Sequence, residues 1–273
     1  MKVREALVDA ARELEPISDT PRLDAELLMA HSMGISRNAM LLFTQGDEHD
    51  PDFFDYLMSR RLMHEPVAYI TGRRAFWTVE LEVGPGVLVP RPDSETLIEA
   101  AVAHFGDGGP ESVLDLGTGP GTPLLAALGQ WPRARGLGVD GSETALVFAR
   151  RNAERLGIAE RARFRLGDWA EGIEERFDLV LCNPPYIEAD AALPRDVSEW
   201  EPPEALFAGP DGLDAYRRLA PQIGRLIAPG GVACIEIGAT QEATVTQLFR
   251  SWKLNPRTVK DLAGRPRCLV VRD

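Results

Sequence analysis

Short apolar, strand-like runs alternate with amphipathic helical segments from about residue 93 onward, and this alternation restricts the fold more than any other feature. Helical patterns such as 143–156 and 213–227 separate most of the runs. Such alternation is typical of a mainly parallel sheet covered by helices on both faces. The predicted strands are Ser112–Leu116, Gly136–Asp140, Ala162–Leu166, Phe177–Cys182 and Val232–Ile237.

The last two strand-like runs predict a different connection. Only residues 263–266 lie between Thr258–Leu262 and Arg267–Val271. A link this short permits an antiparallel hairpin, whereas a parallel crossover needs about a dozen residues or more. The sequence therefore predicts an α/β sheet that ends with an antiparallel strand.

The chain before residue 66 contains only helical patterns. Its first apolar residues recur at helical spacing. Later helices have N-terminal signals, because a capping side chain or a proline at the first helical position precedes each apolar stripe. These signals are Thr20-Pro21, Ser36 and Asp50-Pro51. We expect four or five short helices that form a small bundle.

A third pattern joins these two parts. Residues 76–83 alternate apolar with polar side chains, Gly84-Pro85-Gly86 is a turn signal, and Val87–Val89 follows. This pattern predicts a β-hairpin. The chain is therefore divided into a helical domain (1–70), a hairpin linker (71–92) and an α/β domain (93–273).

Composition narrows the function classes. The 273 residues suffice for one large domain and one small one. The net charge is −12, and the first 74 residues contain 9 Lys and Arg against 13 Asp and Glu. Proteins that bind nucleic acid usually gather basic surface, so nucleic acid is an unlikely partner. Three cysteines without C-x-x-C spacing and four scattered histidines predict no metal site, including at His49 in its acidic loop.

The chain has no apolar signal core near its start and no run of about 18 apolar residues. We therefore expect a cytoplasmic protein without a membrane partner.

A glycine-rich turn follows the first strand of the α/β part. The run Val113–Gly121 passes from an apolar strand into Gly117-Thr118-Gly119-Pro120-Gly121, ahead of a helix. Glycines let the backbone approach a ligand closely. Asp140, which closes the next strand, lies about 20 residues further on, where an acidic side chain meets ribose hydroxyls. Together these features predict a nucleoside-cofactor site.

The cofactor could be a nicotinamide dinucleotide or S-adenosylmethionine. Asp115, two residues before the first glycine, favours S-adenosylmethionine, which has no pyrophosphate and carries a zwitterionic methionine tail. Asp168-Trp169 follows the third strand. In a methyltransferase, Asp168 would accept from the adenine amino group and Trp169 would pack on the ring; simple packing under a helix is the alternative for Trp169.

The sequence Asn183-Pro184-Pro185-Tyr186 directly follows the strand at 177–182. Ligands bind at the carboxyl ends of strands in open α/β sheets. An amide or exocyclic amino nitrogen is a poor nucleophile, and the Asn183 side-chain carbonyl and Pro184 main-chain carbonyl can orient its two N–H groups. The prolines stiffen the loop, and Tyr186 offers a flat face. The motif predicts methyl transfer to a planar nitrogen, mostly by positioning.

The sequence resembles the PrmC/HemK family of release factor glutamine N5-methyltransferases over nearly its whole length. The shared motifs are Glu65-Pro66, Gly72, Phe76-Trp77, Pro90-Arg91-Pro92, Glu95, Asp115–Gly119, Asp140, Asp168-Trp169, Asn183–Ile187, Glu201-Pro202, Ala205-Leu206, Gly212-Leu213, Gly230-Gly231, Glu236–Gly238, Gln241, Asp261–Gly264 and Arg267. The Asn-Pro-Pro-Tyr motif is also found in adenine-N6 DNA methyltransferases, so the linker and C-terminal motifs are more specific.

The resemblance implies a Rossmann-like, seven-stranded class I methyltransferase sheet, mostly parallel with one antiparallel strand. It implies a helical domain that helps dock the substrate, which is the Gly-Gly-Gln glutamine of class 1 peptide-chain release factors. S-adenosylmethionine, leaving as S-adenosylhomocysteine, would contact Gly117–Gly121, Asp140, Trp169 and Asn183. Residues 183–186 would hold the glutamine amide. Pro120 and Pro123 depart from the family pattern, and Pro120 removes a backbone donor.

Three alternatives remain open from the sequence. The acceptor could be a glutamine of another protein, such as a ribosomal protein, or adenine in nucleic acid. A non-catalytic protein that keeps the fold and its nucleoside is the third, although residues 183–186 argue against it. The role of Pro90-Arg91-Pro92, as a gate or only a linker, also remains open.

Overall fold

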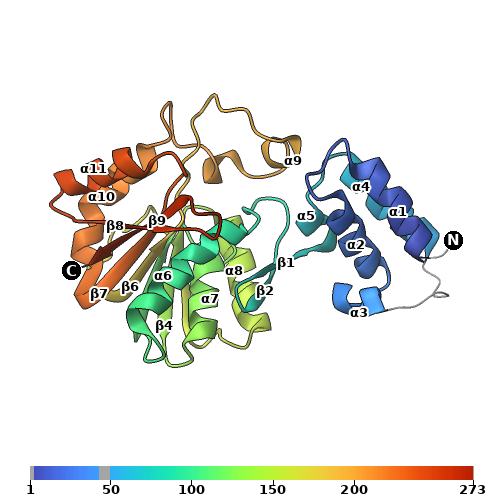
Figure 1. Ribbon diagram of the computed structural model, residues 1–273. Coiled ribbons are helices and arrows are strands. Elements are labelled where there is room, and N and C mark those ends of the chain that lie inside the picture. Colours follow the sequence, from blue (N-terminus) through green and yellow to red (C-terminus); the bar gives the residue numbers. More distant parts are fainter. Residues whose placement is uncertain (1–2, 43–49, 273) are drawn as a thin grey trace. The chain divides into compact units, whose positions relative to one another are not determined.

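The computed structural model describes residues 3–42 and 50–272. By its internal contacts the chain divides into two compact units (Figure 1). One contains the chain up to Arg73 together with Leu193–Trp200, and the other contains Arg74–Ala192 and the chain from Glu201 onward. The roles assigned to the predicted segments 1–70, 71–92 and 93–273 stay predictions.

The first unit is helical. Its elements are α1 (Val3–Leu14), α2 (Pro21–Ser32), α3 (Arg37–Leu42), α4 (Pro51–Leu62), α5 (Val67–Thr71) and the short α9 (Arg195–Ser198). Alanine, leucine and methionine side chains from α1, α2 and α4 share one buried cluster. The Asp50 carboxylate accepts from the Phe53 amide at 3.1 Å and caps α4, as predicted. Thr20 makes no such cap, because its hydroxyl donates to Asp24 instead.

An ion pair ties residues 193–200 to this unit. Arg61 is almost fully buried, and its Nε lies 2.9 Å from Asp24 Oδ2. Its Nη2 also lies 3.5 Å from Asp196 Oδ2. Since a buried guanidinium needs such partners, Asp196 belongs to the packing of the helical unit although it is remote in sequence.

The second unit contains a seven-stranded sheet in the order β5-β4-β3-β6-β7-β9-β8. The strands are β3 (Ser112–Leu116), β4 (Arg135–Asp140), β5 (Ala162–Leu166), β6 (Phe177–Cys182), β7 (Ile227–Glu236), β8 (Arg257–Lys260) and β9 (Pro266–Arg272). Among these seven strands, β9 alone runs in the opposite direction to the others, and it forms the predicted hairpin with β8. The predicted mostly parallel α/β fold is therefore confirmed.

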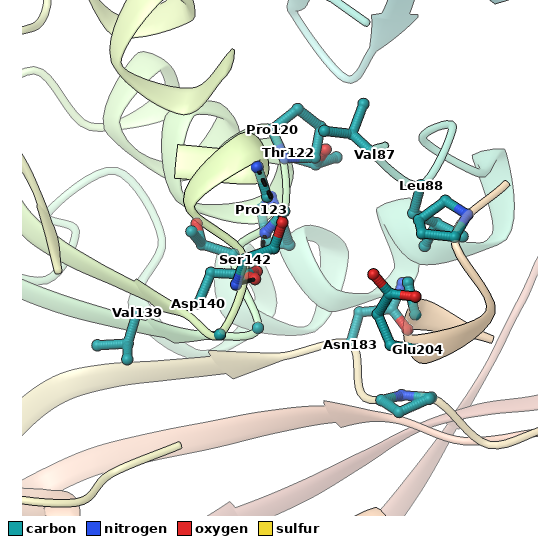
Figure 2. A pocket seen from close by; sticks show the side chains of 18 of the residues that line it. Val87, Leu88, Pro120, Thr122, Pro123, Val139, Asp140, Ser142, Asn183 and Glu204 are labelled. Atoms are coloured by element: carbon teal, nitrogen blue, oxygen red, sulfur yellow. Dashed lines mark hydrogen bonds between the residues drawn. The ribbon is translucent and has the colours of Figure 1, made fainter. Parts of the chain in front are cut away.

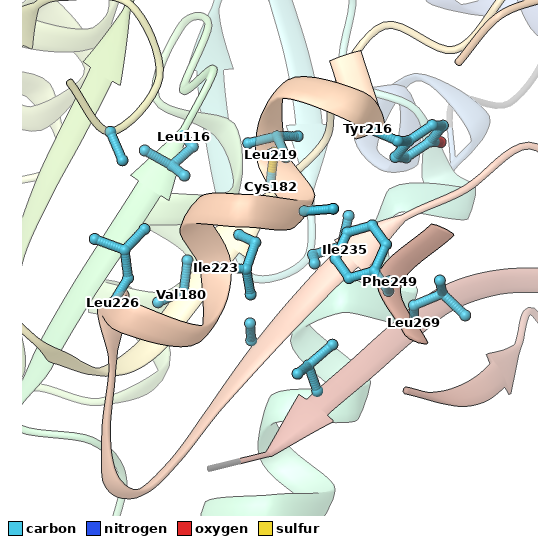
Figure 3. Packing of buried hydrophobic residues seen from close by; sticks show 14 of the residues in the cluster. Leu116, Val180, Cys182, Tyr216, Leu219, Ile223, Leu226, Ile235, Phe249 and Leu269 are labelled. Atoms are coloured by element: carbon cyan, nitrogen blue, oxygen red, sulfur yellow. The ribbon is translucent and has the colours of Figure 1, made fainter. Parts of the chain in front are cut away.

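Helices cover both faces of this sheet. They are α6 (Glu95–Phe105), α7 (Thr122–Gln130), α8 (Glu143–Arg155), α10 (Asp214–Leu226) and α11 (Glu242–Ser251), with the 3-10 turns η1 (Pro92–Ser94) and η2 (Pro203–Ala205). Side chains of α10 and α11 pack on Leu116, Val180 and Ile235 in one buried hydrophobic cluster (Figure 3). Because side chains alternate along a strand, Asp115 points to the opposite face, toward α7.

The predicted hairpin linker is wrong in its turn. The strands are β1 (Arg73–Phe76) and β2 (Val79–Glu82), so the chain turns at Trp77-Thr78 instead of at Gly84-Pro85-Gly86. Trp77 adopts a left-handed φ of 53°. Its amide donates to Glu95 at 2.8 Å and its indole to Gln130 at 2.9 Å. These partners, which are distant in sequence, hold the turn at Trp77-Thr78, and the alternation of apolar and polar residues over 76–83 gave no sign of it.

No helix within residues 3–42 and 50–272 is both long enough and apolar enough to span a membrane.

Candidate active site

A cavity of about 410 Å³ opens at the carboxyl ends of β3, β4 and β6 (Figure 2). Nine predicted site residues line it, namely Gly117, Thr118, Gly119, Pro120, Asp140, Asp168, Trp169, Asn183 and Pro185. Four do not, namely Asp115, Gly121, Pro184 and Tyr186. The sheet thus gathers side chains far apart in sequence at one edge, where the strands' open ends leave room for a ligand.

Three glycines of the glycine-rich loop adopt backbone conformations that other residues rarely adopt. Gly117, Gly119 and Gly121 have φ angles of 72°, 56° and 89°, in the left-handed region that favours glycine. A Cβ on Gly121 would lie only 2.6 Å from Leu125 Cδ1. Pro123 lies in the first turn of α7, where a proline costs no helical hydrogen bond.

Every amide of this loop is already bonded within the protein or replaced by proline. The N–H groups of Gly117 and Thr118 donate to the carbonyl of Val139, and those of Gly121 and Thr122 donate to that of Thr118. The remaining two donate to carboxylates, Gly119 to Asp140 at 2.8 Å and Leu124 to Asp115 at 3.1 Å. The loop therefore offers no N–H cradle to a pyrophosphate, which argues against a dinucleotide.

Asp115 holds the loop from inside the protein. Its carboxylate is fully buried and accepts from the Thr118 hydroxyl at 2.6 Å as well as from the Leu124 amide. Burial raises the pKa of Asp115 to about 7, against the lowering effect of these hydrogen bonds. Its Oδ1 has no hydrogen-bond partner among the described residues. Asp115 therefore shapes the cavity without lining it.

Asp140 closes β4 and faces the cavity. One oxygen accepts from the Gly119 amide and the other from the Ser142 amide, both at 2.8 Å (Figure 2). Burial raises the pKa of Asp140, and the backbone hydrogen bonds lower it. Each carboxylate oxygen keeps a lone pair. The two amides fix the carboxylate so that it can receive a pair of vicinal hydroxyls.

Asp168 and Trp169 lie on one wall of the cavity. Trp169 has a left-handed φ of 50°, and its ring lies beside Gly117, where a Cβ would be 3.5 Å from the ring atom Cζ3. Asp168 forms an ion pair with Arg218 of α10. Asp168 and Trp169 thus present a carboxylate and an aromatic ring near each other, which suits a heterocycle with an amino group.

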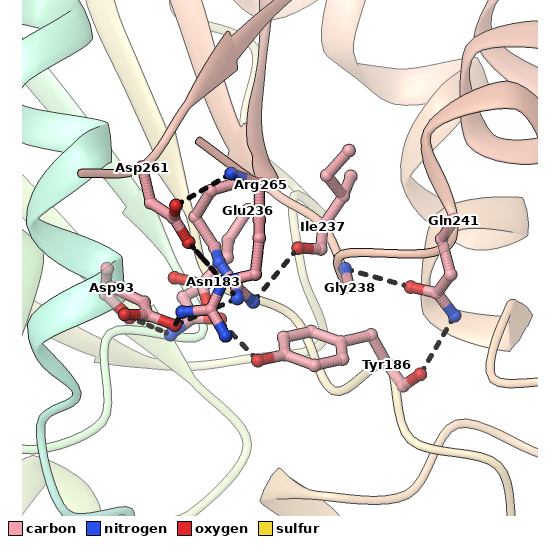
Figure 4. A network of polar contacts seen from close by, with 11 residues as sticks. Asp93, Asn183, Tyr186, Glu236, Ile237, Gly238, Gln241, Asp261 and Arg265 are labelled. Carbon is pink, nitrogen blue, oxygen red and sulfur yellow. Dashed lines mark hydrogen bonds and ion pairs between the residues drawn. The ribbon is translucent and has the colours of Figure 1, made fainter. Parts of the chain in front are cut away.

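Asn183 follows β6 and points its side chain to the cavity, whereas Pro184 is buried behind it. Nδ2 of Asn183 lies 3.0 Å from the Ser94 hydroxyl oxygen. Tyr186 turns its hydroxyl into the protein, where it donates to Glu236 Oε1 at 3.2 Å (Figure 4). Burial, followed by the charge of Glu236, raises the pKa of Tyr186, so this phenol stays neutral.

The segment 86–91 forms another wall. Pro90 and Arg91 line the cavity. Glu201 fixes this wall, because its carboxylate accepts from the Val89 amide at 3.0 Å and from Arg91 Nη2 at 2.5 Å. Pro90 and Arg91 are thus part of the site, and Val87–Val89 is loop instead of strand.

Sequence reasoning missed Asn152 of α8. Its side chain is fully buried and bonds both backbone groups of Glu82, at 2.6 and 3.0 Å. Its Nδ2 also donates to the carbonyl of Pro120 at 2.9 Å. Asn152 thus links the glycine-rich loop to β2. An asparagine on the apolar face of a predicted helix is the only signal that could have indicated it.

Ser94 and Glu236 were also missed as site residues, although Glu236 is in a shared motif. Both are 1% exposed, and the Ser94 hydroxyl lies beside the Glu236 carboxylate. Burial raises the pKa of Glu236 to about 7, and the bond from Ser94 and the charge of Arg267 lower it. A polar residue that ends an otherwise apolar strand was the available signal.

Within the described part of the chain, no group of three His, Cys, Asp or Glu side chains could hold a metal ion. His49 lies outside the described residues.

Two family models match the chain. Residues 5–72 match the model described as the PrmC N-terminal domain. Residues 109–269 match the model described as a methyltransferase domain. Together they cover most of both units.

Curated relatives match over nearly the full length. The chain is 45% identical to the release factor glutamine methyltransferase of Rhodospirillum rubrum, over 93% of this chain and 79% of that protein. Its identity to the protein of the same name from Caulobacter vibrioides is 42%, over 92% and 89%. The solved structure of a ribosomal protein L11 methylase from Lactobacillus delbrueckii subsp. bulgaricus has a TM-score of 0.52 at 20% identity, covering 70% of this chain and 83% of that one, which shows a shared fold.

Proposed function

The chain belongs to the family of release factor glutamine methyltransferases, and on that premise we propose that it methylates the side-chain amide nitrogen (N5) of a glutamine. The glutamine is that of the Gly-Gly-Gln motif in class 1 peptide-chain release factors. The observation that carries this proposal is the Asn183–Tyr186 loop at the mouth of a cavity without a phosphate cradle. The helical unit helps to dock the release factor.

The methyl donor is S-adenosylmethionine, and the residues of the cavity fit it. The bonded amides of residues 117–124 leave no place for phosphates. Asp140 offers oxygen acceptors to the ribose hydroxyls, and Asp168 with Trp169 offers a carboxylate and a ring to adenine. When bound, the donor supplies an electrophilic methyl group on its sulfonium, and S-adenosylhomocysteine is the product.

Asn183 and Pro184 orient the acceptor. The Asn183 side-chain carbonyl and the Pro184 main-chain carbonyl each accept one N–H of the glutamine amide, so that its nitrogen faces the methyl group. The prolines keep the two carbonyls fixed and bring no N–H of their own. Catalysis is then mainly alignment of the two reactants with water excluded, and the methylated nitrogen loses its proton to solvent.

Two other acceptors are less favoured. The first 74 residues carry more acidic than basic side chains, so this part offers no basic surface to nucleic acid. A glutamine of a ribosomal protein would fit the same two carbonyls, and only the relatives' names favour release factors over it.

A methyl-transfer assay tests this proposal. Labelled S-adenosylmethionine is incubated with a class 1 release factor from the same source, and with the same factor after replacement of its Gly-Gly-Gln glutamine. Label should enter only the first acceptor, and Asn183→Ala should abolish it while donor binding, measured by calorimetry, persists. Donor binding by the wild-type protein without labelling of the release factor would exclude this substrate; ribosomal protein and nucleic acid are then assayed in its place.

A further inference from the structure

The end of the Asn183 carboxamide that faces the cavity decides whether this side chain can bind an amide acceptor. One end is an oxygen that accepts hydrogen bonds, and the other is a nitrogen that donates them. The two ends have almost the same shape, so only the hydrogen-bond network distinguishes them. A glutamine nitrogen presents N–H groups and therefore needs the Oδ1 end. The neighbour that engages the other end must fix this choice.

Ser94 is that neighbour. Its oxygen lies 3.0 Å from Nδ2 of Asn183. Its hydroxyl lies beside the Glu236 carboxylate and lowers the pKa of that group as a hydrogen-bond donor. A serine has one hydroxyl proton, and an ionised carboxylate can only accept. The proton of Ser94 therefore points to Glu236, and its oxygen is left to accept from Asn183. This arrangement turns Nδ2 of Asn183 toward Ser94 and leaves Oδ1 for the cavity.

The same carboxylate holds the other end of the loop. The Tyr186 hydroxyl donates to Oε1 of Glu236 at 3.2 Å (Figure 4). The main-chain carbonyl of Tyr186 accepts from Nε2 of Gln241 at 3.0 Å. Glu236 is the last residue of β7, which pairs with β6 directly before the loop. A single buried carboxylate thus accepts from Tyr186 on one side of the two prolines, and on the other side it lies beside the Ser94 hydroxyl that binds Asn183.

We propose that Glu236 is a positioning residue, which acts through the Ser94 hydroxyl to keep Oδ1 of Asn183 directed at the acceptor nitrogen and through the Tyr186 hydroxyl to keep the loop in place. This inference rests on the proposed methyl transfer, in which Asn183 receives the acceptor amide. A protonated Glu236 can itself donate to Ser94. The Ser94 proton is then released, and the Asn183 carboxamide can turn its nitrogen to the cavity.

Glu236, like Asp115 behind the glycine-rich loop, changes its protonation near neutral pH. Burial raises its pKa to about 7. The titratable or charged groups that act on it or feel its charge are Asp93, Cys182, Tyr186, Tyr216, Arg267 and Cys268. Burial raises the pKa of both tyrosines and both cysteines, so these four stay neutral. The Arg267 guanidinium lies 2.9 Å from Asp93, and these two charges offset each other beside Glu236.

The first test reads Asn183 directly and needs no acceptor. The side-chain ¹⁵N–¹H signals of Asn183 are identified by their absence from the spectrum of Asn183→Asp. In the wild-type protein they should shift between pH 5.5 and 8.5 with a midpoint near 7. In Glu236→Gln and in Ser94→Ala the shift should disappear. Signals that stay constant in the wild-type protein, or that still titrate in Glu236→Gln, would overturn the proposal.

The second test uses the methyl-transfer assay with saturating S-adenosylmethionine at pH 8. Glu236→Gln should lower kcat about tenfold or more, with donor affinity changed less than about twofold, because alignment and not cofactor binding is lost. Ser94→Ala should cause a similar loss, and adding Glu236→Gln to it should cost little more, since both changes break one chain of hydrogen bonds. Ser94→Thr keeps the hydroxyl and should restore most activity.

Glu175→Gln is the matched control, because Glu175 is exposed and precedes β6 at the opposite end of the strand. Its activity and pH profile should equal those of the wild-type protein. Additive losses in the double variant, or an unchanged kcat in Glu236→Gln, would contradict the role of Glu236. If the wild-type protein does not label the release factor, the proposed function fails, and the titration of Asn183 still decides the orientation.

Discussion

Two fully buried carboxylates, Asp115 and Glu236, support opposite sides of one cavity and do so by different means. Burial raises the pKa of both to about 7, and each has one oxygen without a hydrogen-bond partner among the described residues. Asp115 accepts from a hydroxyl and a backbone amide within ten residues of itself along the chain. Glu236 accepts from the Tyr186 hydroxyl and lies beside the Ser94 hydroxyl, and both residues come from distant segments.

The difference separates the tasks of the two carboxylates. Asp115 fixes the backbone of the glycine-rich loop, so its loss should weaken the binding of the methyl donor. Glu236 orients side chains, so its loss should leave binding intact and slow the reaction. Since both groups are equally buried, their burial alone does not reveal which task each one has.

Removing the Asp115 carboxylate should have the largest effect. Asp115→Ala leaves the Thr118 hydroxyl and the Leu124 amide without their acceptor, at a cost of about 3 kcal/mol. We expect the dissociation constant for S-adenosylhomocysteine, measured by calorimetry, to rise about 100-fold. At saturating S-adenosylmethionine, kcat should stay within a few-fold of the wild-type value. A dissociation constant equal to that of the wild-type protein would show that Asp115 does not support donor binding, and the difference in task between Asp115 and Glu236 would be lost.

The pH dependence of stability should reveal both carboxylates. A folded-state pKa of about 7 exceeds the usual value near 4, so the folded protein binds a proton that the unfolded chain has released. The stability that these two groups contribute is therefore fully present at low pH and is lost, by about 1.4 kcal/mol per pH unit and per group, as the pH rises from about 4.5 to 7. Asp115→Asn or Glu236→Gln should each remove one such slope in urea titrations, and Glu175→Gln should remove none.

Asn152→Ala should weaken donor binding, as Asp115→Ala is expected to, but by a smaller factor. The change removes the link from Pro120 to β2 and leaves the Pro120 carbonyl and the Glu82 backbone unpaired. We expect donor affinity to fall about tenfold, which corresponds to roughly 1.4 kcal/mol, with an unchanged KM for the acceptor. A raised acceptor KM at unchanged donor affinity would show that Asn152, like Glu236, acts on the acceptor and not on donor binding.

Tyr186→Phe should have the smallest effect. The variant removes the Tyr186 hydroxyl, which donates to Glu236 Oε1 at 3.2 Å and lowers the pKa of that carboxyl. The midpoint of the pH profile of kcat should therefore move upward, and kcat at pH 8 should fall about two- to fivefold. A downward shift would show that the phenol does not stabilise the ionised carboxylate.

The sequence predicted the parts of the site that local patterns encode. The left-handed glycines, Asp140 at the end of β4 and Asn183 after β6 follow from residue type and strand order. The turn at Trp77 did not follow, because Glu95 and Gln130 hold it from other elements. Asn152 and Ser94 were missed for the same reason. Neither Asn152 nor Ser94 is itself part of a sequence motif, and these residues meet their partners only in the folded chain.

The fully bonded amides of residues 117–124 have a kinetic consequence. Because all its amides are already bonded, the loop is ordered before a ligand binds. Its amides should therefore exchange slowly with deuterium in both the free and the bound protein. Donor and product share the adenosine and amino-acid parts, so a loop that is already ordered should make the same contacts with both. We therefore expect S-adenosylhomocysteine to compete strongly, so that turnover depends on how quickly the cell removes this product.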